Sequence, residues 1–269
     1  MEYQVLTPQD PAYPARLKER LGSEAPERLY YRGPLNLLQR FTMAAISADY
    51  SPGTALWASN QLFFTIRDYE INYIGGHHSV IEMEIFRLGL YFPHTSVSLF
   101  TARGLGKETF ESFLLTRFSP PMHEFPERKE YFRRAEEGEL LMLSITDPQE
   151  GGMTGKNIRL RNWIACNLAD VVYVPGAIKG SKTLPMAKRV FKAGIPIFTT
   201  DHESNIYLHK IGIPAYTRKT VGKYLETLSA HLAPPPSKEV TYLNLEPSPP
   251  PPPRLIQRPL PFPKGSRLR

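Results

Sequence analysis

From Phe41 onward, short apolar segments alternate with longer segments that have helical periodicity. Residues 41–46, 69–74, 96–100, 140–144, 171–174 and 195–198 form the apolar segments. A short apolar strand that is flanked by helices belongs in a parallel sheet covered on both faces. Repeated strand–helix alternation also implies right-handed crossovers. The sequence therefore predicts an α/β fold with a doubly wound, mostly parallel sheet.

The segments between these strands are expected to be helical. One helix begins near Pro52, a residue type that suits the first helical position. Another begins after Ser79, which with Glu82 three residues later forms a capping-box pattern. Further helices are predicted at residues 107–116, 127–137, 155–168, 183–193 and 221–232.

The composition of the chain changes at two points and divides it into three parts. Residues 1–40 are predicted to form an N-terminal extension packed on the core, with a helix at 15–20 that turns Leu17 inward and a strand near 29–33. Residues 41–232 form the α/β domain. Residues 233–269 are a Pro-rich tail, in which only Val240–Leu245 could pair as an edge strand. Three interpretations of this tail stay open: a solvated segment, a docking peptide, or a basic segment that adds electrostatic contacts to nucleic acid.

The chain is basic, with 33 Lys and Arg against 26 Asp and Glu and a formal net charge of +7. Such an excess favours an anionic partner. The single cysteine, Cys166, excludes an intramolecular disulfide and a cysteine-rich zinc site, which fits a reducing cytoplasm. No apolar run approaches the length of a membrane span. We therefore expect a cytoplasmic protein that makes no contact with membranes.

The loop after the predicted strand 171–174 is a candidate phosphate site. Lys179 and Lys182 supply charge, Gly180 permits close approach of the backbone, and Ser181 and Thr183 place hydroxyls beside the first amides of a helix. The glycine spacing is not that of a Walker A loop. The alternative is a capped helix with incidental lysines.

A second basic group lies at the start of the predicted helix 155–168. Arg159 and Asn162 lie on neighbouring faces of this helix, while Arg161 points elsewhere. Paired arginines near the ends of the strands could clamp a phosphate, and Lys156 adds a charge one turn earlier. The alternative is a solvated helix start.

Two glycines and two histidines follow the strand at 69–74. Gly75 and Gly76 permit a tight turn over a ligand, and either His77 or His78 could contact that ligand or the backbone. A metal site is not expected, because neighbouring histidines point apart and no Cys, His or Asp cluster accompanies them. The acid–histidine group at 201–203 is a weaker candidate for acid–base chemistry.

Several segments, in order, resemble conserved blocks of the DNA-processing protein A (Smf) family. The segments are RNWIACNLADVVYV at 161–174, KGSKTLPMAK at 179–188, PIFTT at 196–200 and NIYLHKIGIPA at 205–215. Residues 13–17 and 29–33 match the family's entry into its Rossmann-like domain. The resemblance spans about residues 10–230.

This resemblance implies an extended Rossmann-like fold with a pocket at the carboxyl ends of the strands that grips single-stranded DNA. It implies a homodimer that passes DNA to a RecA-type recombinase. By position, Arg161 and Asn162 match the family's Arg-Asn pair, and Gly75 and Gly76 match its glycine turn.

The chain departs from the family pattern at four places. The family's Gly-Ile-Asp helix start is replaced by residues 77–84, which read HHSVIEME. The family's Gly-Ser-Arg loop is replaced by Ile46–Tyr50, which lacks arginine and contains Asp49. Trp163 occupies the position of the family's third arginine. The Pro-rich tail stands in the place of the family's winged-helix domain. Loss of a pocket arginine is expected to weaken the hold on phosphate by about 1–3 kcal/mol.

Two functions are therefore expected, from different classes. The first is non-specific binding of single-stranded DNA in DNA uptake, protection or recombination, without catalytic residues, metal or cofactor. The second is a nucleotide-binding protein or a nucleoside-monophosphate hydrolase-like enzyme. That enzyme class is expected to carry a Pro-Gly-Gly-x-Gly-Thr motif with a glutamate, and Pro175–Gly180 preserves only the beginning of this motif. A scaffold whose tail docks a partner is a third possibility.

Overall fold

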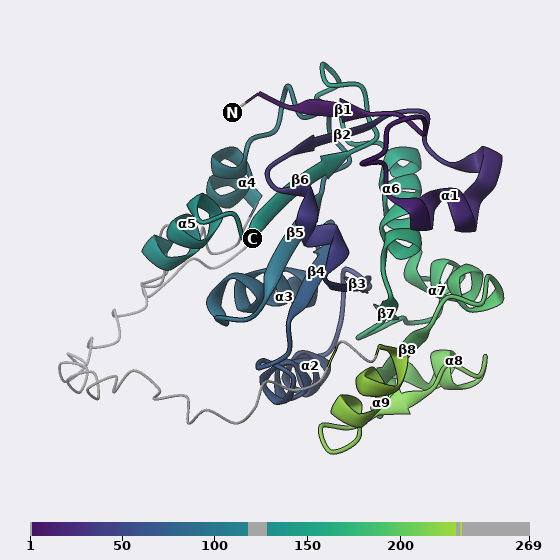
Figure 1. The fold of residues 1–269 in the computed structure, drawn as a ribbon. Coiled ribbons are helices and arrows are strands. Elements are labelled where there is room, and N and C mark those ends of the chain that lie inside the picture. Colours follow the sequence, from purple (N-terminus) through teal and green to yellow (C-terminus); the bar gives the residue numbers. More distant parts are fainter. Residues whose placement is uncertain (1, 118–127, 230–231, 233–269) are drawn as a thin grey trace, which may run out of the picture. The chain divides into compact units, whose positions relative to one another are not determined.

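The computed structural model describes residues 2–117, 128–229 and 232. Within these residues a single nine-stranded sheet runs in the order β1-β2-β6-β5-β4-β3-β7-β8-β9 (Figure 1). The strands are β1 Gln4–Leu6, β2 Leu29–Arg32, β3 Phe41–Ala45, β4 Ile71–Gly75, β5 Ser96–Phe100, β6 Leu140–Ser144, β7 Val171–Tyr173, β8 Ile197–Thr200 and β9 Ala215–Tyr216.

The sheet is mostly parallel, as the strand–helix alternation predicts. Every neighbouring pair from β6 through β9 is parallel, whereas β1–β2 and β2–β6 are antiparallel. The expected doubly wound, Rossmann-like α/β fold is therefore confirmed. The N-terminal residues contribute two strands to this sheet at one of its edges.

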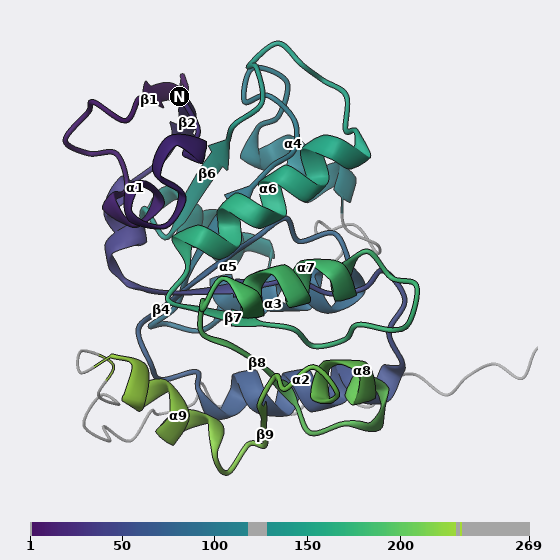
Figure 2. The same ribbon diagram turned by 90° about the vertical axis from the view of Figure 1, so that its right-hand side faces the viewer.

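Helices cover both faces of the sheet (Figure 2). Side chains of α1, α6, α7 and α8 pack on one face, and those of α2, α3, α4, α5 and α9 pack on the other. The helices are α1 Ala15–Leu21, α2 Gly53–Thr65, α3 Val80–Tyr91, α4 Phe110–Arg117, α5 Arg128–Glu136, α6 Gly155–Leu168, α7 Thr183–Lys192, α8 Ile206–His209 and α9 Val221–Leu228.

The alternation of side chains along β3 shows how the two cores are separated. Met43 and Ala45 point into the core beneath α2 and α3, and Ala44 points into the core beneath α6 and α7. All three residues are buried. A strand buried on both faces needs apolar residues at every position, which is why the segment reads as a continuous apolar run.

The predicted elements differ from the observed ones mainly at their ends and at the sheet edges. The strands β1 and β9 and the helix α8 were not predicted, because two to four residues are too few to show a period. Leu17 is buried on α1, as expected. The possible edge strand at Val240–Leu245 lies outside the described residues.

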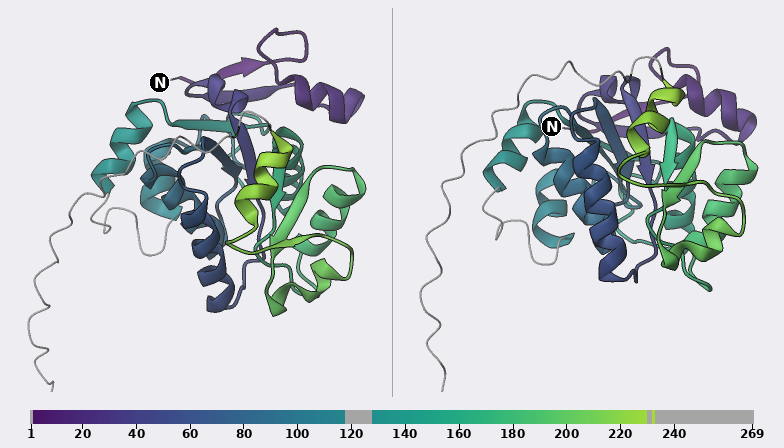
Figure 3. Two further views of the ribbon diagram at one scale, coloured as in Figure 1. Left: turned by 60° about the horizontal axis from the view of Figure 1, so that its bottom comes forward. Right: turned by 90° about the horizontal axis from the view of Figure 1, so that it is seen from below.

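The helix α9 lies against the end of α2 (Figure 3). The Tyr69 hydroxyl, just beyond α2, donates to Glu226 Oε1 over 2.7 Å, and Arg218 Nη1 donates to Gln61 Oε1 over 3.4 Å. The last part of the described chain is thereby held beside a helix from its first third.

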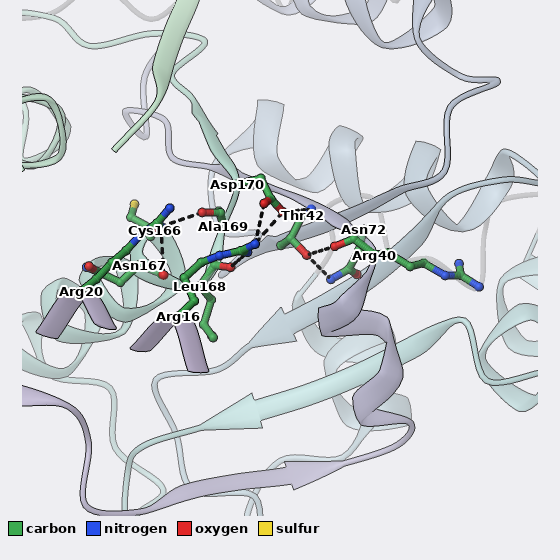
Figure 4. A network of polar contacts seen from close by, with 10 residues as sticks. All are labelled: Arg16, Arg20, Arg40, Thr42, Asn72, Cys166, Asn167, Leu168, Ala169 and Asp170. Carbon is green, nitrogen blue, oxygen red and sulfur yellow. Dashed lines mark hydrogen bonds and ion pairs between the residues drawn. The ribbon is translucent and has the colours of Figure 1, made fainter. Parts of the chain in front are cut away.

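A polar network joins α1 to the amino-terminal edge of the sheet (Figure 4). Arg16 pairs with Asp170 at 2.5 Å, and Asp170 accepts a hydrogen bond from the Thr42 backbone nitrogen at 2.8 Å. Arg20 donates to the carbonyl oxygens of Asn167 at 3.0 Å and Ala169 at 2.7 Å. Carbonyls at a helix end lack partners within the helix, so Arg20 caps α6.

Among the described residues, no helix combines the length and the apolar character that crossing a bilayer requires.

Candidate functional site

The order of the strands places a crevice between β3 and β7. From β3 the chain moves outward through β4, β5 and β6, and α6 then carries it back to β7 on the other side of β3. Loops that follow β3 and β7 therefore leave the carboxyl edge of the sheet in opposite directions. In open α/β sheets, ligands bind at this switch point.

A cavity of about 510 Å³ lies at this switch point. It is enclosed by the loop after β3, the loop before α7, and the first half of α6. Eight residues that the sequence singles out as candidates line it: His78, Arg159, Asn162, Lys179, Gly180, Ser181, Lys182 and Thr183. Residues from four separate chain segments thus meet at one site.

Backbone contacts hold the two strand loops together. Ile46 donates its N–H to the Tyr173 carbonyl at 3.1 Å, and Ala48 donates to the Gly176 carbonyl at 3.0 Å. A β-carbon on Gly176 would stand 2.9 Å from Ser51 Oγ, so a glycine permits this approach. The floor of the cavity is therefore fixed by main-chain hydrogen bonds.

The loop 179–183 forms a helix start, as the sequence predicts. Gly180 adopts φ +83°, which a glycine tolerates without strain. Ser181 Oγ accepts the Leu184 N–H at 3.3 Å in the first turn of α7. The first amides of a helix have no acceptor within the helix and carry partial positive charge. Such a terminus favours an anion.

The charges on the cavity are mainly positive. Of the described residues that line it, Arg159, Lys179 and Lys182 are basic and exposed, whereas Asp49 is acidic. Asp49 belongs to the loop that departs from the family pattern. The cavity thus carries an excess of positive charge, which one carboxylate reduces.

Arg161 does not line the cavity. The residue is 1% exposed, and its Nη1 donates to the Phe100 carbonyl at 2.6 Å. Burial lowers the pKa of its guanidinium to about 10, an effect that attraction to Glu82 opposes. Arg161 therefore stays charged at neutral pH, but points into the protein. Helical spacing places Arg161 on a different face of α6 from Arg159 and Asn162, but it does not show what that face contacts, because this depends on which strand α6 crosses.

The glycine turn accommodates Arg161. A β-carbon on Gly76 would stand 1.4 Å from Arg161 Nη1, so only glycine leaves room for the guanidinium. Gly75 is buried against the Ala45 carbonyl. Neither glycine lines the cavity, and the turn serves an internal contact in this structure.

The capping motif at α3 ties the neighbouring loops together through Glu82. Ser79 Oγ accepts the Glu82 N–H at 3.2 Å, as predicted. The Glu82 carboxylate instead accepts from the backbone of Ser47 at 2.7 Å and of His78 at 3.1 Å. Burial raises the pKa of this carboxyl, while these two hydrogen bonds and Arg161 lower it. Glu82 therefore anchors the loop after β3 through its hydrogen bond with the Ser47 backbone.

His77 is buried and unable to reach a ligand in the cavity. Its backbone adopts φ +50°, and its Nδ1–H donates to the Glu82 carbonyl at 3.0 Å. Burial lowers the pKa of its imidazole to about 3. His78 lines the cavity instead.

The remaining candidates lie away from the cavity. Lys156 is exposed on α6 but does not line it, and neither do Asp201, His202 and Glu203. His202 instead accepts the Ser204 N–H at 3.1 Å and caps a short helical turn.

Within the described part of the chain, no group of three or more His, Cys, Asp or Glu residues is placed to hold a metal ion.

Two exposed aromatic residues were missed from the sequence, one at the cavity and one on α2, the helix that follows it in the chain. Tyr50 lines the cavity and is 84% exposed, and Trp57 on α2 is 66% exposed. The adjacent aromatic pairs Tyr30-Tyr31 and Phe63-Phe64 are expected from the sequence to pack in the core, and Tyr30 and Phe63 are indeed buried. An aromatic residue in the loop that follows a buried strand was the available signal for Tyr50.

A larger cavity of about 970 Å³ lies elsewhere, between β1–β2 and α4–α5. Its lining is mostly apolar and contains several acidic residues. The only basic residue among its described lining residues, Arg32, donates to the carbonyls of Leu105 and Glu108. This cavity therefore does not suit a phosphate.

Two solved structures share this α/β arrangement. DNA processing protein A from Streptococcus pneumoniae superposes with a TM-score of 0.65 at 18% identity, over 83% of this chain and 75% of that one. DNA processing protein A from Helicobacter pylori, which binds single-stranded DNA, superposes with a TM-score of 0.62 at 16% identity, over 84% of this chain and 97% of that one.

The fold of this chain is thus similar to that of DNA processing protein A. No protein-family model and no curated protein matches the sequence.

Proposed function

We propose that this chain binds single-stranded DNA at the cavity between β3 and β7, without regard to base sequence. The observation that carries the proposal is the convergence of Arg159, Lys179 and Lys182 around the start of α7. Lysine and arginine neutralise phosphates and release their counterions, which supplies most of the free energy of non-specific binding. The similarity of the fold to a single-stranded DNA-binding protein supports the same conclusion.

The three cations and the helix start have separate roles in this proposal. Lys179 and Lys182 supply mobile charge at the rim, and Arg159 can bind a phosphate with two parallel hydrogen bonds. The amide N–H groups that begin α7 can donate hydrogen bonds to a phosphate oxygen from fixed positions. Arg161, which is buried beneath the cavity, adds positive electrostatic potential but does not itself contact the bound phosphate in this proposal.

We extend the proposal to the biological role that the resemblance implies. The chain would act in the cytoplasm in DNA uptake, protection or recombination, as a homodimer that hands DNA to a RecA-type recombinase. It would do so without catalysis. Co-sedimentation of the purified chain with a recombinase on DNA tests that partner.

A salt series of oligonucleotide binding tests the central proposal. A fluorescent oligo-thymidine should bind with log affinity that falls linearly with log salt, by about 0.7 for each phosphate neutralised. Lys182→Ala and Lys179→Ala should each weaken binding equally for all base sequences and make the slope shallower by a similar amount. Fluorescence anisotropy measures both quantities.

Lys188→Ala is the matched control, since Lys188 is exposed on α7 but does not line the cavity. Absence of binding at low salt, or an affinity that salt does not change, would rule the proposal out.

A second candidate ligand is a mononucleotide. A cavity of about 510 Å³ falls in the range that holds a small molecule. Hydrolysis of a nucleoside monophosphate needs a carboxylate, and Asp49 is the one carboxylate among the described residues that line the cavity. A rise in melting temperature with a mononucleotide, but none with an oligonucleotide, would favour this candidate.

A further inference from the structure

We infer that a single strand bound at the cavity continues along α2, with its bases stacked on Tyr50, Trp57 and Phe64. This inference rests on the proposed function and adds the path of the strand. We call the exposed face that carries Trp57, Gln61 and Phe64 the α2 face.

The α2 face is aromatic and uncharged, and its link to the core is an edge-on contact of the Phe64 ring with Phe92, whose ring centroid lies 5.2 Å away. Trp57 is 66% and Phe64 is 43% exposed, whereas the opposite side of the helix is buried through Ala55, Leu62 and Phe63. The whole of α2, Gly53–Thr65, contains no acidic or basic residue. A surface helix normally turns polar residues outward, so exposed rings on this side indicate a contact that folding alone does not need.

Helical spacing places these residues in one row. Trp57 and Phe64 are seven residues apart, which is close to two turns, and Gln61 lies between them on the same side. The two ring positions are therefore separated along the helix by about 10 Å. Bases on a flexible strand can reach both rings, and stacking on a ring does not require a particular base.

A cation from another element lies on the same face. Arg218, in the turn after β9, donates from Nη1 to Gln61 Oε1 at 3.4 Å. Arg218 and its neighbour Lys219 are both exposed. Rings flanked by a guanidinium are the usual pattern of single-strand binding, in which cations follow the backbone and aromatic side chains hold the bases.

The α2 face also continues from the cavity. Tyr50 lines the cavity and is 84% exposed, and α2 begins three residues after it. A strand whose phosphates occupy the cavity would therefore meet Tyr50 first and Trp57 next. This continuity, together with the cations, favours a nucleic acid over a second copy of the chain as the occupant.

The fluorescence of Trp57 can test the inference, because the chain has only two tryptophans. The other, Trp163, is 7% exposed beneath the Arg189 guanidinium, whose Cζ lies 3.7 Å from the ring centroid. In a Trp163→Phe chain, the fluorescence arises from Trp57 alone. A twelve-residue oligo-thymidine should quench this fluorescence with the same midpoint as the anisotropy titration, and thymidine monophosphate should not quench it.

Affinity measurements on variants complete the test. Trp57→Ala should weaken oligo-thymidine binding by roughly 5- to 150-fold and leave the salt slope unchanged, because a ring contributes stacking and no charge. Arg218→Ala should make the slope shallower by about 0.7. Phe191→Ala, which removes a similarly exposed ring at the far end of α7, should change neither quantity.

Three outcomes would overturn the inference. Oligonucleotide binding without a change in Trp57 fluorescence, and with full affinity in Trp57→Ala, would remove the path and leave the proposed function standing. A Trp57 signal that depends on protein concentration without DNA would assign the α2 face to a second copy. Failure of the unaltered chain to bind at low salt would remove the proposed function and the path together.

Discussion

Asp49 lies at the cavity among side chains that are otherwise basic or uncharged. Its carboxylate would face the phosphates of a bound strand, and like charges repel even across water. Asp49→Asn should therefore raise the affinity for oligo-thymidine at low salt by about two- to fivefold, the scale of an exposed charge pair. Anisotropy titrations at two salt concentrations measure the gain, which should shrink as salt rises.

Glu136→Gln provides the control for Asp49→Asn, because Glu136 is exposed on α5 and does not line the cavity. An equal gain in both variants would show that net charge alone is responsible.

His77 should give the folded protein a pH dependence of stability. Its pKa is lowered from 6.5 to about 3 on folding, because the imidazole is buried. The unfolded chain therefore binds a proton that the folded chain excludes, and the stabilisation present above pH 6.5 is lost as pH falls toward 3. While the imidazole is neutral in the folded state and charged in the unfolded state, this loss is about 1.4 kcal/mol per pH unit.

Urea unfolding of His77→Asn between pH 7 and 4.5 measures this contribution. Asparagine tolerates φ +50° better than most residues and does not titrate. The free energy of unfolding of the unaltered chain should fall more steeply with acid than that of the variant. Glu82 does not cause this difference, since its raised pKa acts in both chains and with the opposite sign. Parallel curves would contradict the assignment.

At the scale of elements, α6 links the cavity, the core and the N-terminal helix. Arg159 and Asn162 line the cavity, Arg161 points to β5, and the last carbonyls of α6 accept from Arg20 on α1. The positions of these groups around one helix follow from its period of 3.6 residues. A shift of α6 along its axis would therefore disturb all three contacts at once.

The cap that α1 supplies to α6 should contribute to stability. Arg20→Ala removes the hydrogen bonds from a cation to the carbonyls of Asn167 and Ala169 and should lower the free energy of unfolding by about 1–2 kcal/mol. Urea denaturation measures this loss. Glu19→Ala on the same helix changes an exposed residue and should have a far smaller effect. Equal losses in the two variants would contradict a capping role.

At the scale of the whole molecule, the order of the strands decides where a ligand can bind. The return of the chain through α6 to β7 creates a switch point beside β3, and the loops after both strands meet there. The aromatic α2 face and the turn that holds Arg218 come from opposite halves of the described chain, and a hydrogen bond joins them. The proposed path of the strand therefore depends on topology as well as on residue type.

The sequence by itself determined the central strands, most helices and the loop 179–183 as a phosphate candidate. Buried parallel strands and amphipathic helices leave local patterns, and local patterns need no knowledge of neighbours. Only the tertiary structure decided which face of α6 packs against the sheet and which face lines the cavity. Arg161 and Arg159 are two residues apart on one helix, yet one lies in the core and the other lines the cavity. Burial of a charge depends on partners distant in sequence, here Gly76 and the Phe100 carbonyl, and no local pattern records them.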